Sequence, residues 1–475
     1  MIELVIGNST SQLKNLTTEH MRGLRKVLFY RDTSKRIERT MRDKISGKPI
    51  FTAAGKVKTV LIHPTVYLID KHGVFPTGLL YIVYEYIRSH GVQYRKLDTR
   101  VMPNPHTIGL ESILPRDHRL PYEPCREQLE AALAASMRHR GIVVAPTGFG
   151  KSAIIALIIE KLQVPTLIVV PSLELKNQLT GTLVDIFGSH MVGALNKGKK
   201  KYQITVENVD HLNKKIPAKG FDCVIIDEFH RSGSATYRTL NTKCWNSIYY
   251  RIGLTATPFR SNDEERLLLE SVLSKVIYKI EYKTAIGIGR IVPMETYFID
   301  LPKIQCKATS WQGVYKELVV ERKDRNELLC DLIENLYTQS VSALVLVKQI
   351  EHGKKLCEIL ESRGISVPFA NGKDGSNKEL ISKFNASEFP VLIGTSGVLG
   401  EGIDTRPCEY VILAGGGKSK NQFMQQVGRG FRVYPGKASC KIIMLRDSSN
   451  KWLMEHHRAC VKYLAEEFNS VPAKI

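Results

Sequence analysis

The stretch Ala145-Pro146-Thr147-Gly148-Phe149-Gly150-Lys151-Ser152 sets the architecture that we predict for this 475-residue chain. An apolar run, residues 141–144, precedes it, and a longer apolar run, residues 153–159, comes after it. This pattern predicts a buried strand, a glycine turn and the start of a helix. Such a turn suits phosphate, because its glycines let several backbone N–H groups point inward and the helix adds the positive end of its dipole.

The last two residues of this loop carry side chains suited to a bound triphosphate. Lys151 can reach the β- and γ-phosphates, and Ser152 can place its hydroxyl on Mg²⁺. The general phosphate-loop pattern opens with Gly, whereas this chain has Ala145. Taken alone, the stretch also fits an ordinary turn between a buried strand and a helix, so its assignment depends on the motifs downstream. The predicted cofactors are ATP and Mg²⁺.

A second buried strand ends in two carboxylates. Residues 221–226 are mostly apolar and lead into Asp227 and Glu228. Placing two carboxylates at the end of a buried strand destabilises the fold unless a cation or a water molecule binds them. Asp227 therefore suits a Mg²⁺ contact, and Glu228 suits a base that orients the attacking water. A charged strand end in solvent is the alternative, and the phosphate loop upstream makes it the weaker one.

Strands alternate with helices again in the second half of the chain, which favours a second parallel sheet. That half has no phosphate loop of its own, so it can contribute to ATP chemistry only across a cleft. Arg429 and Arg432 are spaced three apart after a helical stretch and suit γ-phosphate oxygens, which guanidinium groups bind bidentately. A surface arginine pair is the alternative.

Charge is the strongest compositional feature of the chain. It has 68 Lys and Arg against 47 Asp and Glu, a formal net charge of +21. A soluble protein has little need of such an excess unless it binds a polyanion, and nucleic acid is the first candidate. A basic surface that only aids solubility is the alternative on charge alone.

The cysteines and the apolar runs exclude several classes of protein. The nine cysteines lie far apart without a C-x-x-C pair, so we expect reduced thiols rather than zinc, iron–sulfur or disulfide sites. No apolar run approaches the roughly 18 to 20 residues that span a bilayer, and the N-terminus lacks a signal-peptide pattern. We therefore expect a cytoplasmic protein with no membrane, zinc or iron–sulfur partner.

Residues 1 to about 118 have a character of their own. Residues 1–119 contain 20 Lys and Arg against 10 Asp and Glu, which is +10 of the total +21. The apolar segments 57–68 and 74–87 are expected to form a small core, which makes this an accessory α+β domain. We predict that it grips nucleic acid, mainly through phosphates. A solvated basic face is the alternative.

Four prolines between residues 100 and 121 predict a linker, after which a helical pattern opens with Gln128 near its start. A glutamine one turn into a helix upstream of a phosphate loop can pair with the edge of an adenine. Elsewhere the same residue would simply be exposed on a helix.

Together these motifs resemble the superfamily 2 helicases of the DExH branch, across residues 119 to 445. Ala often stands first in motif I of that family. The segments that match the family's motifs, in the family's order, are Gln128, 145–152 (motif I), 171–178 (Ia), 227–230 (II), 255–257 (III), 395–404 (V) and 425–432 (VI).

The resemblance implies a fold and a role for each matching residue. The fold is α/β, with two RecA-like parallel-sheet domains (residues 119–285 and 286–475) preceded by the small basic α+β domain (residues 1–118). ATP would lie in the cleft between the two RecA-like domains, with nucleic acid across their top. The implied catalytic residues are Lys151, Glu228, Gln425, Arg429 and Arg432; the further ATP contacts are Gln128, residues 145–152, Gly402 and Asp404; the Mg²⁺ ligands are Ser152 and Asp227; the coupling residues are His230, Thr255 and Thr257; and the nucleic-acid contacts are Pro171, Ser172 and Thr395.

The size of the chain, its basic N-terminal domain and its ending soon after motif VI look like the phage helicases that remodel branched DNA. We therefore predict an ATP-dependent DNA helicase or translocase that unwinds or branch-migrates forks and junctions, as a monomer, in the host cytoplasm if a phage encodes it. An RNA helicase of the same superfamily remains open, although DEAD-type members would have Asp-Glu-Ala-Asp and Ser-Ala-Thr at residues 227–230 and 255–257. A strand-annealing binder that uses ATP only as a switch remains open too.

Overall fold

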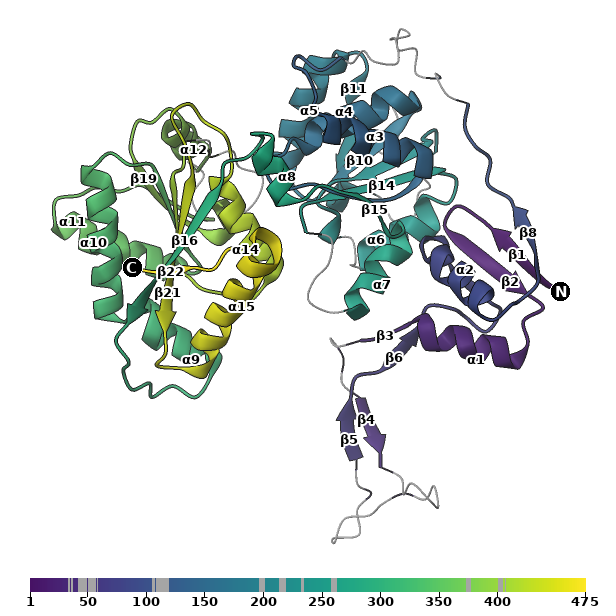
Figure 1. Cartoon of the computed structure of the whole chain (residues 1–475), viewed down its shortest axis with the longest axis horizontal. Helices are drawn as coiled ribbons and strands as arrows, with labels where there is room; N and C mark the ends of the chain where they lie inside the picture. Colours follow the sequence, from purple (N-terminus) through teal and green to yellow (C-terminus); the bar gives the residue numbers. More distant parts are fainter. Residues whose placement is uncertain are drawn as a thin grey trace.

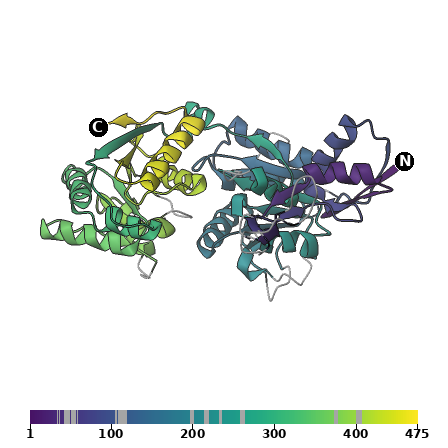
Figure 2. The ribbon, with the colours of Figure 1, turned by 90° about the horizontal axis from the view of Figure 1, so that it is seen from below.

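The computed structural model divides the chain into an N-terminal domain and two α/β domains. The first α/β domain lies between the other two in both views of the ribbon (Figures 1 and 2). The structure describes residues 1–32, 35, 37–41, 49, 57, 59–104, 107, 119–195, 201–212, 219–231, 235–257, 263–372, 377–399, 405 and 407–475.

The N-terminal domain is a small α+β unit built on a four-stranded sheet with the order β7-β2-β1-β8. Its core is apolar and includes Leu4, Leu24 and Phe75. Two pairs of short strands, β3 with β6 and β4 with β5, form separate two-stranded sheets. Its elements are β1 (Ile2–Ile6), β2 (Thr10–Lys14), α1 (Thr18–Val27), β3 (Phe29–Arg31), β4 (Ile37–Thr40), β5 (Thr59–Ile62), β6 (Thr65–Tyr67), β7 (Val74–Pro76), η1 (Thr77–Leu79), α2 (Leu80–Ser89) and β8 (Tyr94–Asp98).

One prediction for this domain is wrong. Residues 57–68 were expected to lie in its core, but Val60 is 44% exposed and Leu61 is 59% exposed. The reason is that β5 pairs only with β4, and both strands are largely exposed. The second expected segment does pack inward, since Phe75, Val83 and Ile87 belong to the core.

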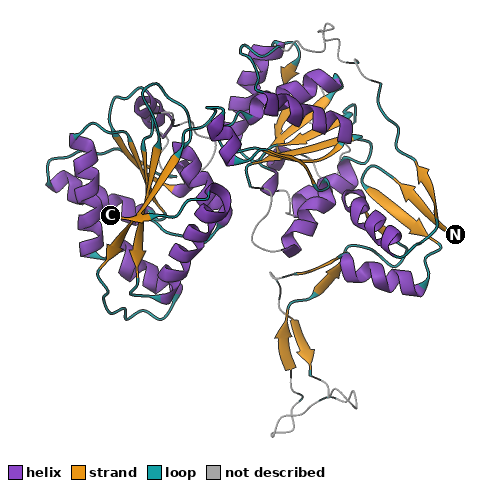
Figure 3. Cartoon of the chain, in the orientation of Figure 1, coloured by secondary structure: helices purple, strands orange, loops and turns teal. Residues whose placement is uncertain are grey.

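The first α/β domain has a seven-stranded sheet with the order β11-β12-β10-β13-β14-β9-β15. Each neighbouring pair runs parallel, and helices cover both faces (Figure 3). Its elements are α3 (Arg126–Arg138), β9 (Arg140–Val144), α4 (Lys151–Leu162), β10 (Thr166–Val170), α5 (Leu173–Phe187), β11 (Val192–Gly193), β12 (Ile204–Asn208), η2 (Val209–His211), β13 (Cys223–Ile226), η3 (Phe229–Arg231), α6 (Ala235–Thr239), η4 (Leu240–Cys244), β14 (Tyr250–Thr255), α7 (Asp263–Val272), β15 (Val276–Lys279) and α8 (Tyr282–Gly287).

The second α/β domain repeats this plan with the order β18-β19-β17-β20-β21-β16-β22, again all parallel. Two parallel sheets are what the sequence predicts, and that prediction is confirmed. The elements are β16 (Met294–Leu301), α9 (Trp311–Tyr315), η5 (Lys316–Val320), α10 (Lys323–Thr338), β17 (Ala343–Val347), α11 (Ile350–Ser362), β18 (Phe369–Ala370), α12 (Asn377–Asn385), β19 (Val391–Thr395), α13 (Ser396–Leu399), β20 (Tyr410–Leu413), α14 (Lys420–Val427), η6 (Gly428–Gly430), β21 (Cys440–Asp447), α15 (Lys451–Phe468) and β22 (Ala473–Lys474).

Buried polar groups join the N-terminal domain to the first α/β domain. Arg251 on β14 is fully buried and donates hydrogen bonds to the hydroxyl of Ser9 (3.0 Å) and to the side chain of Asn241. Burial and the charge of Arg140 lower the pKa of Arg251 well below its ordinary value. Because an unsatisfied buried guanidinium is costly, these hydrogen bonds fix how the two domains meet.

None of the described helices is long and apolar enough to cross a membrane. Likewise, in the described part of the chain, no group of three or more His, Cys, Asp and Glu side chains could hold a metal ion.

Candidate nucleotide site

The loop 145–152 connects β9 to α4 and has the geometry of a phosphate cradle. Gly148 and Gly150 have φ values of +85° and +95°, which residues with a Cβ rarely adopt. The loop is tied to the sheet where Ala145 N donates to Thr255 O (3.0 Å). Within the described residues, no acceptor receives the N–H groups of Gly148, Gly150, Lys151 and Ser152. The N–H groups of Gly150, Lys151 and Ser152 at the start of α4, and that of Gly148 in the loop, are therefore placed to bind an anion.

Asp227 and Glu228 follow β13 and lie beside the loop, where Glu228 contacts Lys151. The side chain of Lys151 donates to Glu228 Oε1, and Glu228 N donates to Asp227 Oδ1 (2.9 Å). Burial alone would lower the pKa of Lys151, but the charges of Glu228 and Asp227 raise it. Burial raises the pKa of Asp227. Burial would also raise the pKa of Glu228, but the charge of Lys151 holds it well below its ordinary value.

The backbone of Glu228 is unusual, because its φ of +47° lies in the left-handed region. A non-glycine residue there is uncommon and marks strain that the surroundings maintain. The turn lets Asp227 and Glu228 point their carboxylates into one site instead of to opposite faces of a strand.

A chain of polar contacts leads from Glu228 to the second α/β domain. His230 Nδ1 lies 3.3 Å from Glu228 Oε2 and 3.1 Å from Thr255 Oγ1. Thr255 Oγ1 also accepts from Thr257 N (3.1 Å). On the other side of the ring, His230 Nε2 lies 3.4 Å from Nε2 of Gln425 on α14. The structure thus brings together the three predicted coupling residues and Gln425.

The second α/β domain meets the loop directly. A Cβ built on Gly428 would lie 2.8 Å from Thr147 Cβ, and one built on Gly148 would lie 3.7 Å from Arg432 Cγ. Arg429 is 6% exposed, and its charge opposes the rise in the pKa of Lys151 that Glu228 and Asp227 cause. Both predicted arginines are therefore at the junction between the domains, beside the loop.

Gly428 is a site residue that sequence reasoning missed. Any side chain at this position would collide with Thr147, so glycine is what permits the two domains to touch. Thr405 is a second such residue, because its hydroxyl donates to Arg429 O (3.2 Å). The glycine in motif VI was a usable signal for the first, whereas nothing in the sequence points to the second.

Gln128 is placed next to the loop but is engaged within the protein. Its Nε2 donates to Phe149 O (3.1 Å), and its Oε1 accepts from Cys125 N (3.1 Å). The side chain is 1% exposed. Here Gln128 supports the loop and the start of α3, and an adenine contact would require its amide to exchange a partner.

The predicted nucleic-acid contacts lie just after β10 and at the end of β19. Ser172 caps α5 by accepting from Leu175 N (3.2 Å), directly after Pro171. Thr395 is the last residue of β19 and is 8% exposed. Gly402 and Asp404 lie outside the described residues.

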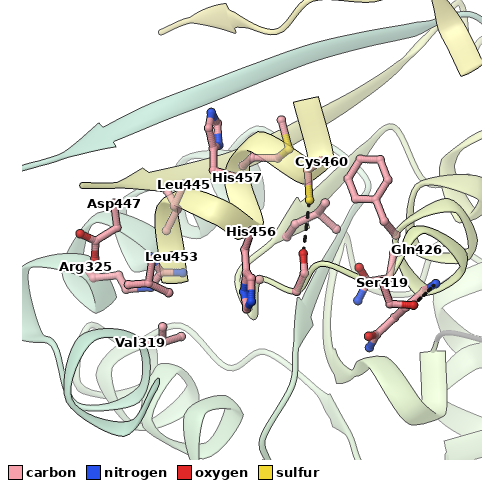
Figure 4. Close-up of a pocket in the computed structure, with 16 residues that line it drawn as sticks. Val319, Arg325, Ser419, Gln426, Leu445, Asp447, Leu453, His456, His457 and Cys460 are labelled. Carbon is pink, nitrogen blue, oxygen red and sulfur yellow. Dashed lines mark hydrogen bonds between the residues drawn. The ribbon is translucent and has the colours of Figure 1, made fainter. Parts of the chain in front are cut away.

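A separate pocket lies in the second α/β domain, beside α14 and α15 (Figure 4). Buried Arg325 lies on its wall and donates to Ala414 O (2.7 Å), while Cys460 Sγ donates to Gly417 O (3.5 Å). Its lining includes neither loop 145–152 nor the two carboxylates, so it is distinct from the candidate nucleotide site.

Two families of known proteins match the chain. Residues 121–260 match "Type III restriction enzyme, res subunit", and residues 324–434 match "Helicase conserved C-terminal domain". These two matches cover the loop and carboxylates of one domain and the arginines of the other. The chain belongs to superfamily 2 of the ATP-dependent helicases. The predicted family and the RecA-like fold are thereby confirmed.

Named relatives of this helicase include proteins from viruses and archaea. A protein of Sulfolobus islandicus filamentous virus named helicase 22 is 26% identical over 367 residues, which is 70% of this chain but only 64% of the viral protein. The DNA 3'-5' translocase XPB2 of Sulfurisphaera tokodaii is 26% identical over 374 residues, 70% of this chain and 83% of its own length. The ATP-dependent DNA helicase uvsW of phage T4 is 23% identical over 350 residues, 69% of each protein.

A solved structure agrees with the helicase fold. It is a fragment described as the HsdR subunit of a type I restriction enzyme from Vibrio vulnificus, with a TM-score of 0.57 and 17% identity over 96% of this chain and 95% of that one. At this identity the likeness concerns the fold alone.

The residues of the helicase site fit ATP and Mg²⁺. The loop's N–H groups that no described acceptor receives and one lysine suit phosphate oxygens, while a hydroxyl and a carboxylate, on Ser152 and Asp227, are oxygen ligands of the kind that Mg²⁺ prefers.

Proposed function

We propose that this helicase is an ATP-driven DNA translocase that remodels branched DNA. The observation that carries the proposal is the junction at the loop, where Gly428 lies against Thr147 and Arg432 lies over Gly148. Because a single site takes residues from both α/β domains, hydrolysis there changes the contact between them. A change of that contact is what moves a two-domain motor along a strand.

Phosphate binding begins with an exchange of partners at Lys151. Its ammonium now pairs with Glu228, and a triphosphate would draw it away while accepting from the N–H groups of the loop. When bound, Mg²⁺ supplies positive charge to the β- and γ-phosphate oxygens. Ser152 and Asp227 would hold that ion. Once Lys151 has moved, the carboxylate of Glu228 is free to accept a proton from water.

Glu228 is the proposed base. While Lys151 is in contact, its charge holds the pKa of Glu228 low, so the carboxylate is ionised; when Lys151 moves to the phosphates, that effect is relieved and the carboxylate becomes a better proton acceptor. His230 positions it, since the ring lies 3.3 Å from Glu228 Oε2. Arg429 and Arg432 would stabilise the charge that develops on the transferred phosphoryl group.

The link from hydrolysis to movement runs through Gln425. It contacts His230 across the domain junction, and His230 contacts Glu228 and Thr255 within the first α/β domain. A change in position of Glu228 at the γ-phosphate would therefore be transmitted to Gln425 on α14 through the imidazole ring of His230. We propose that the functional units are residues 1–118, 119–285 and 286–475, and that the motor works as a monomer.

DNA is the proposed track for two reasons. Relatives that span most of this chain are named as a DNA translocase and a DNA helicase. The chain also carries a net charge of +21, which favours a polyanion. The branched-DNA substrate rests on the resemblance to phage helicases of this size that have a basic N-terminal domain.

Steady-state ATP hydrolysis tests this proposal. It would be measured with no nucleic acid, single-stranded DNA, duplex DNA, a four-way junction and single-stranded RNA, at one salt concentration because phosphate contacts are salt-dependent. We expect the junction to stimulate hydrolysis most. Equal or greater stimulation by RNA would refute the DNA track, and hydrolysis that no nucleic acid stimulates would refute the motor.

A further inference from the structure

A two-stranded ribbon projects from the N-terminal domain, at the bottom of Figure 1. It consists of β4 and β5, paired antiparallel with Ile37 opposite Ile62 and Arg39 opposite Val60. Alternation along the strands puts these four side chains on one face of the ribbon. The other face carries Glu38, Thr40, Thr59 and Leu61.

Among the described residues, no side chain of β4 or β5 belongs to a hydrophobic core. Ile37 is 46% exposed, Val60 is 44% exposed and Leu61 is 59% exposed. A two-stranded sheet alone is marginally stable in water, and its apolar side chains do not stabilise it while they remain exposed to water. A binding partner that covers these side chains would stabilise the ribbon.

The sequence of the segment that contains the ribbon, together with its described side chains, indicates the chemistry of that partner. Residues 31–63 contain nine Lys and Arg against three Asp and Glu. On the described part, the side chain of Lys35 is 72% exposed, and Arg31 and Arg39 are exposed as well. Helix α1, which leads into the ribbon, adds exposed Arg22 and Lys26. The complementary partner is a polyanion with an apolar interior, as nucleic acid is.

We propose that this ribbon lies in the major groove of duplex DNA next to the branch point. The major groove is about 12 Å wide and admits a two-stranded β-ribbon. The strands of such a ribbon lie about 4.8 Å apart, so backbone and side chains together fill the groove. Lys35 then meets a phosphate at the wall of the groove. Ile37, Val60 and Ile62 contact thymine methyl groups at the base edges. Arg39 lies on the same face, and its long side chain reaches a phosphate at the edge of the groove. The proposal rests on the proposed function and names the duplex as a second binding surface of the motor.

The base of the ribbon is attached to the first α/β domain. Its strands continue into β3 and β6, where Asp32 N donates to Pro64 O (2.9 Å). Tyr30 on β3 is buried, and its hydroxyl accepts from Arg238 (3.4 Å) on α6, which comes after the Asp227–Glu228 motif. A duplex held by the ribbon would therefore move with this α/β domain while the other one steps.

Two changes test the ribbon in the full-length protein. The first is a Lys35→Glu/Arg39→Glu variant, and the second is excision of residues 33–63, with Asp32 and Pro64 joined through an Asn-Gly turn. The matched control is Arg458→Glu/Lys462→Glu on α15, a Lys and an Arg that are both exposed. Equilibrium binding of a 30-base-pair duplex is measured without ATP over a range of salt concentrations. Hydrolysis stimulated by single-stranded DNA is measured alongside.

We expect the double variant to bind the duplex about 10- to 100-fold more weakly near 0.1 M salt, with a salt slope smaller by about 2. Excision should weaken binding further. The control variant should bind like the unchanged protein, and stimulation by single-stranded DNA should persist in all variants. The hydrolysis measurement tests the proposed motor, and the binding measurement tests the ribbon. If no nucleic acid stimulates hydrolysis, the proposed function fails, but the effect of the ribbon variants on duplex binding can still be measured.

Unchanged duplex affinity after excision overturns the inference, as does an equal loss in the control variant. A further outcome is that the protein is a dimer, that excision of residues 33–63 makes it a monomer, and that duplex binding does not change. This outcome would overturn the inference and identify a second copy of the chain as the partner of the ribbon.

Discussion

The two α/β domains have the same strand order, and they differ in the residues that come directly after equivalent strands. In the first, β9 is followed by the glycine loop and Lys151, and β13 by Asp227 and Glu228. In the second, the equivalent β16 is followed by residues 302–310, which contain no glycine, and β20 by Ala414 and a run of glycines. The shared sheet therefore does not carry the chemistry; the residues at the ends of its strands do.

The second domain contributes to the site from a helix instead. Helix α14 and the turn after it supply Gln425, Arg429 and Arg432, which meet residues of the first domain at the junction. Each domain is thus incomplete alone, since one holds the phosphate-binding groups and the other holds the arginines. A site divided in this way makes ATP hydrolysis sensitive to the distance between the domains.

The largest expected effect is that of Arg432, which tests whether the second domain contributes to the chemical step. Arg432→Ala should lower ATP turnover by about 10³- to 10⁵-fold, the usual contribution of an arginine that neutralises the transferred phosphoryl group. ATP binding, measured by fluorescence of a nucleotide analogue, should persist. Arg446→Ala in the same domain is the control, because Arg446 pairs with Asp300 instead of facing the loop. Turnover within a few-fold of the unchanged protein would show that the second domain contributes no such charge.

The first domain's part is tested by Glu228→Gln, which should lower turnover by about 10²- to 10⁴-fold because the amide cannot accept the proton from water. ATP should remain bound and unhydrolysed, as single-turnover quenching with labelled ATP would show. Glu207→Gln is a control, since Glu207 is a buried carboxylate that, like Glu228, pairs with a lysine, in this case Lys176 (2.5 Å). Normal cycling by the Glu228 variant would remove Glu228 from the role of base.

The contact between the domains is tested by Gln425→Ala. Loss of one hydrogen bond of about 1 kcal/mol should lower the stimulation of hydrolysis by DNA about five-fold, with the rate in the absence of DNA much less affected. Gln422→Ala on the same helix is the control. If both rates fall equally, Gln425 acts in the chemical step and does not couple the domains.

The smallest expected effects are those of two helix caps, one in each α/β domain. Ser172 caps α5 in the first domain and Ser419 caps α14 in the second, each accepting one backbone N–H. Either change to Ala should cost about 1 kcal/mol of stability, seen as a lower Tm. Only Ser419→Ala should also slow basal hydrolysis, by a few-fold, because α14 leads into both arginines. Equal effects of the two variants on hydrolysis would contradict the division of labour.

Much of the site could be predicted because its residues are close together in sequence. The loop 145–152 and the pair Asp227–Glu228 carry their chemistry within a few positions, so residue type and spacing were enough. Alternation of strands and helices likewise indicated two parallel sheets. The core of the N-terminal domain was harder, because an apolar strand such as residues 59–62 has the same pattern whether it packs inward or stands in a ribbon.

The sequence alone therefore determined the fold class, the phosphate loop, the acidic strand end and the excess of positive charge, since each depends on local pattern or composition. Only the tertiary structure decided that Gly428 lies against Thr147, that His230 meets Gln425, that Gln128 supports the loop, and that β4 and β5 stand away from any core. The physical reason is that these contacts join residues far apart in the chain. Which distant surfaces meet depends on the packing of whole domains, which no local pattern records.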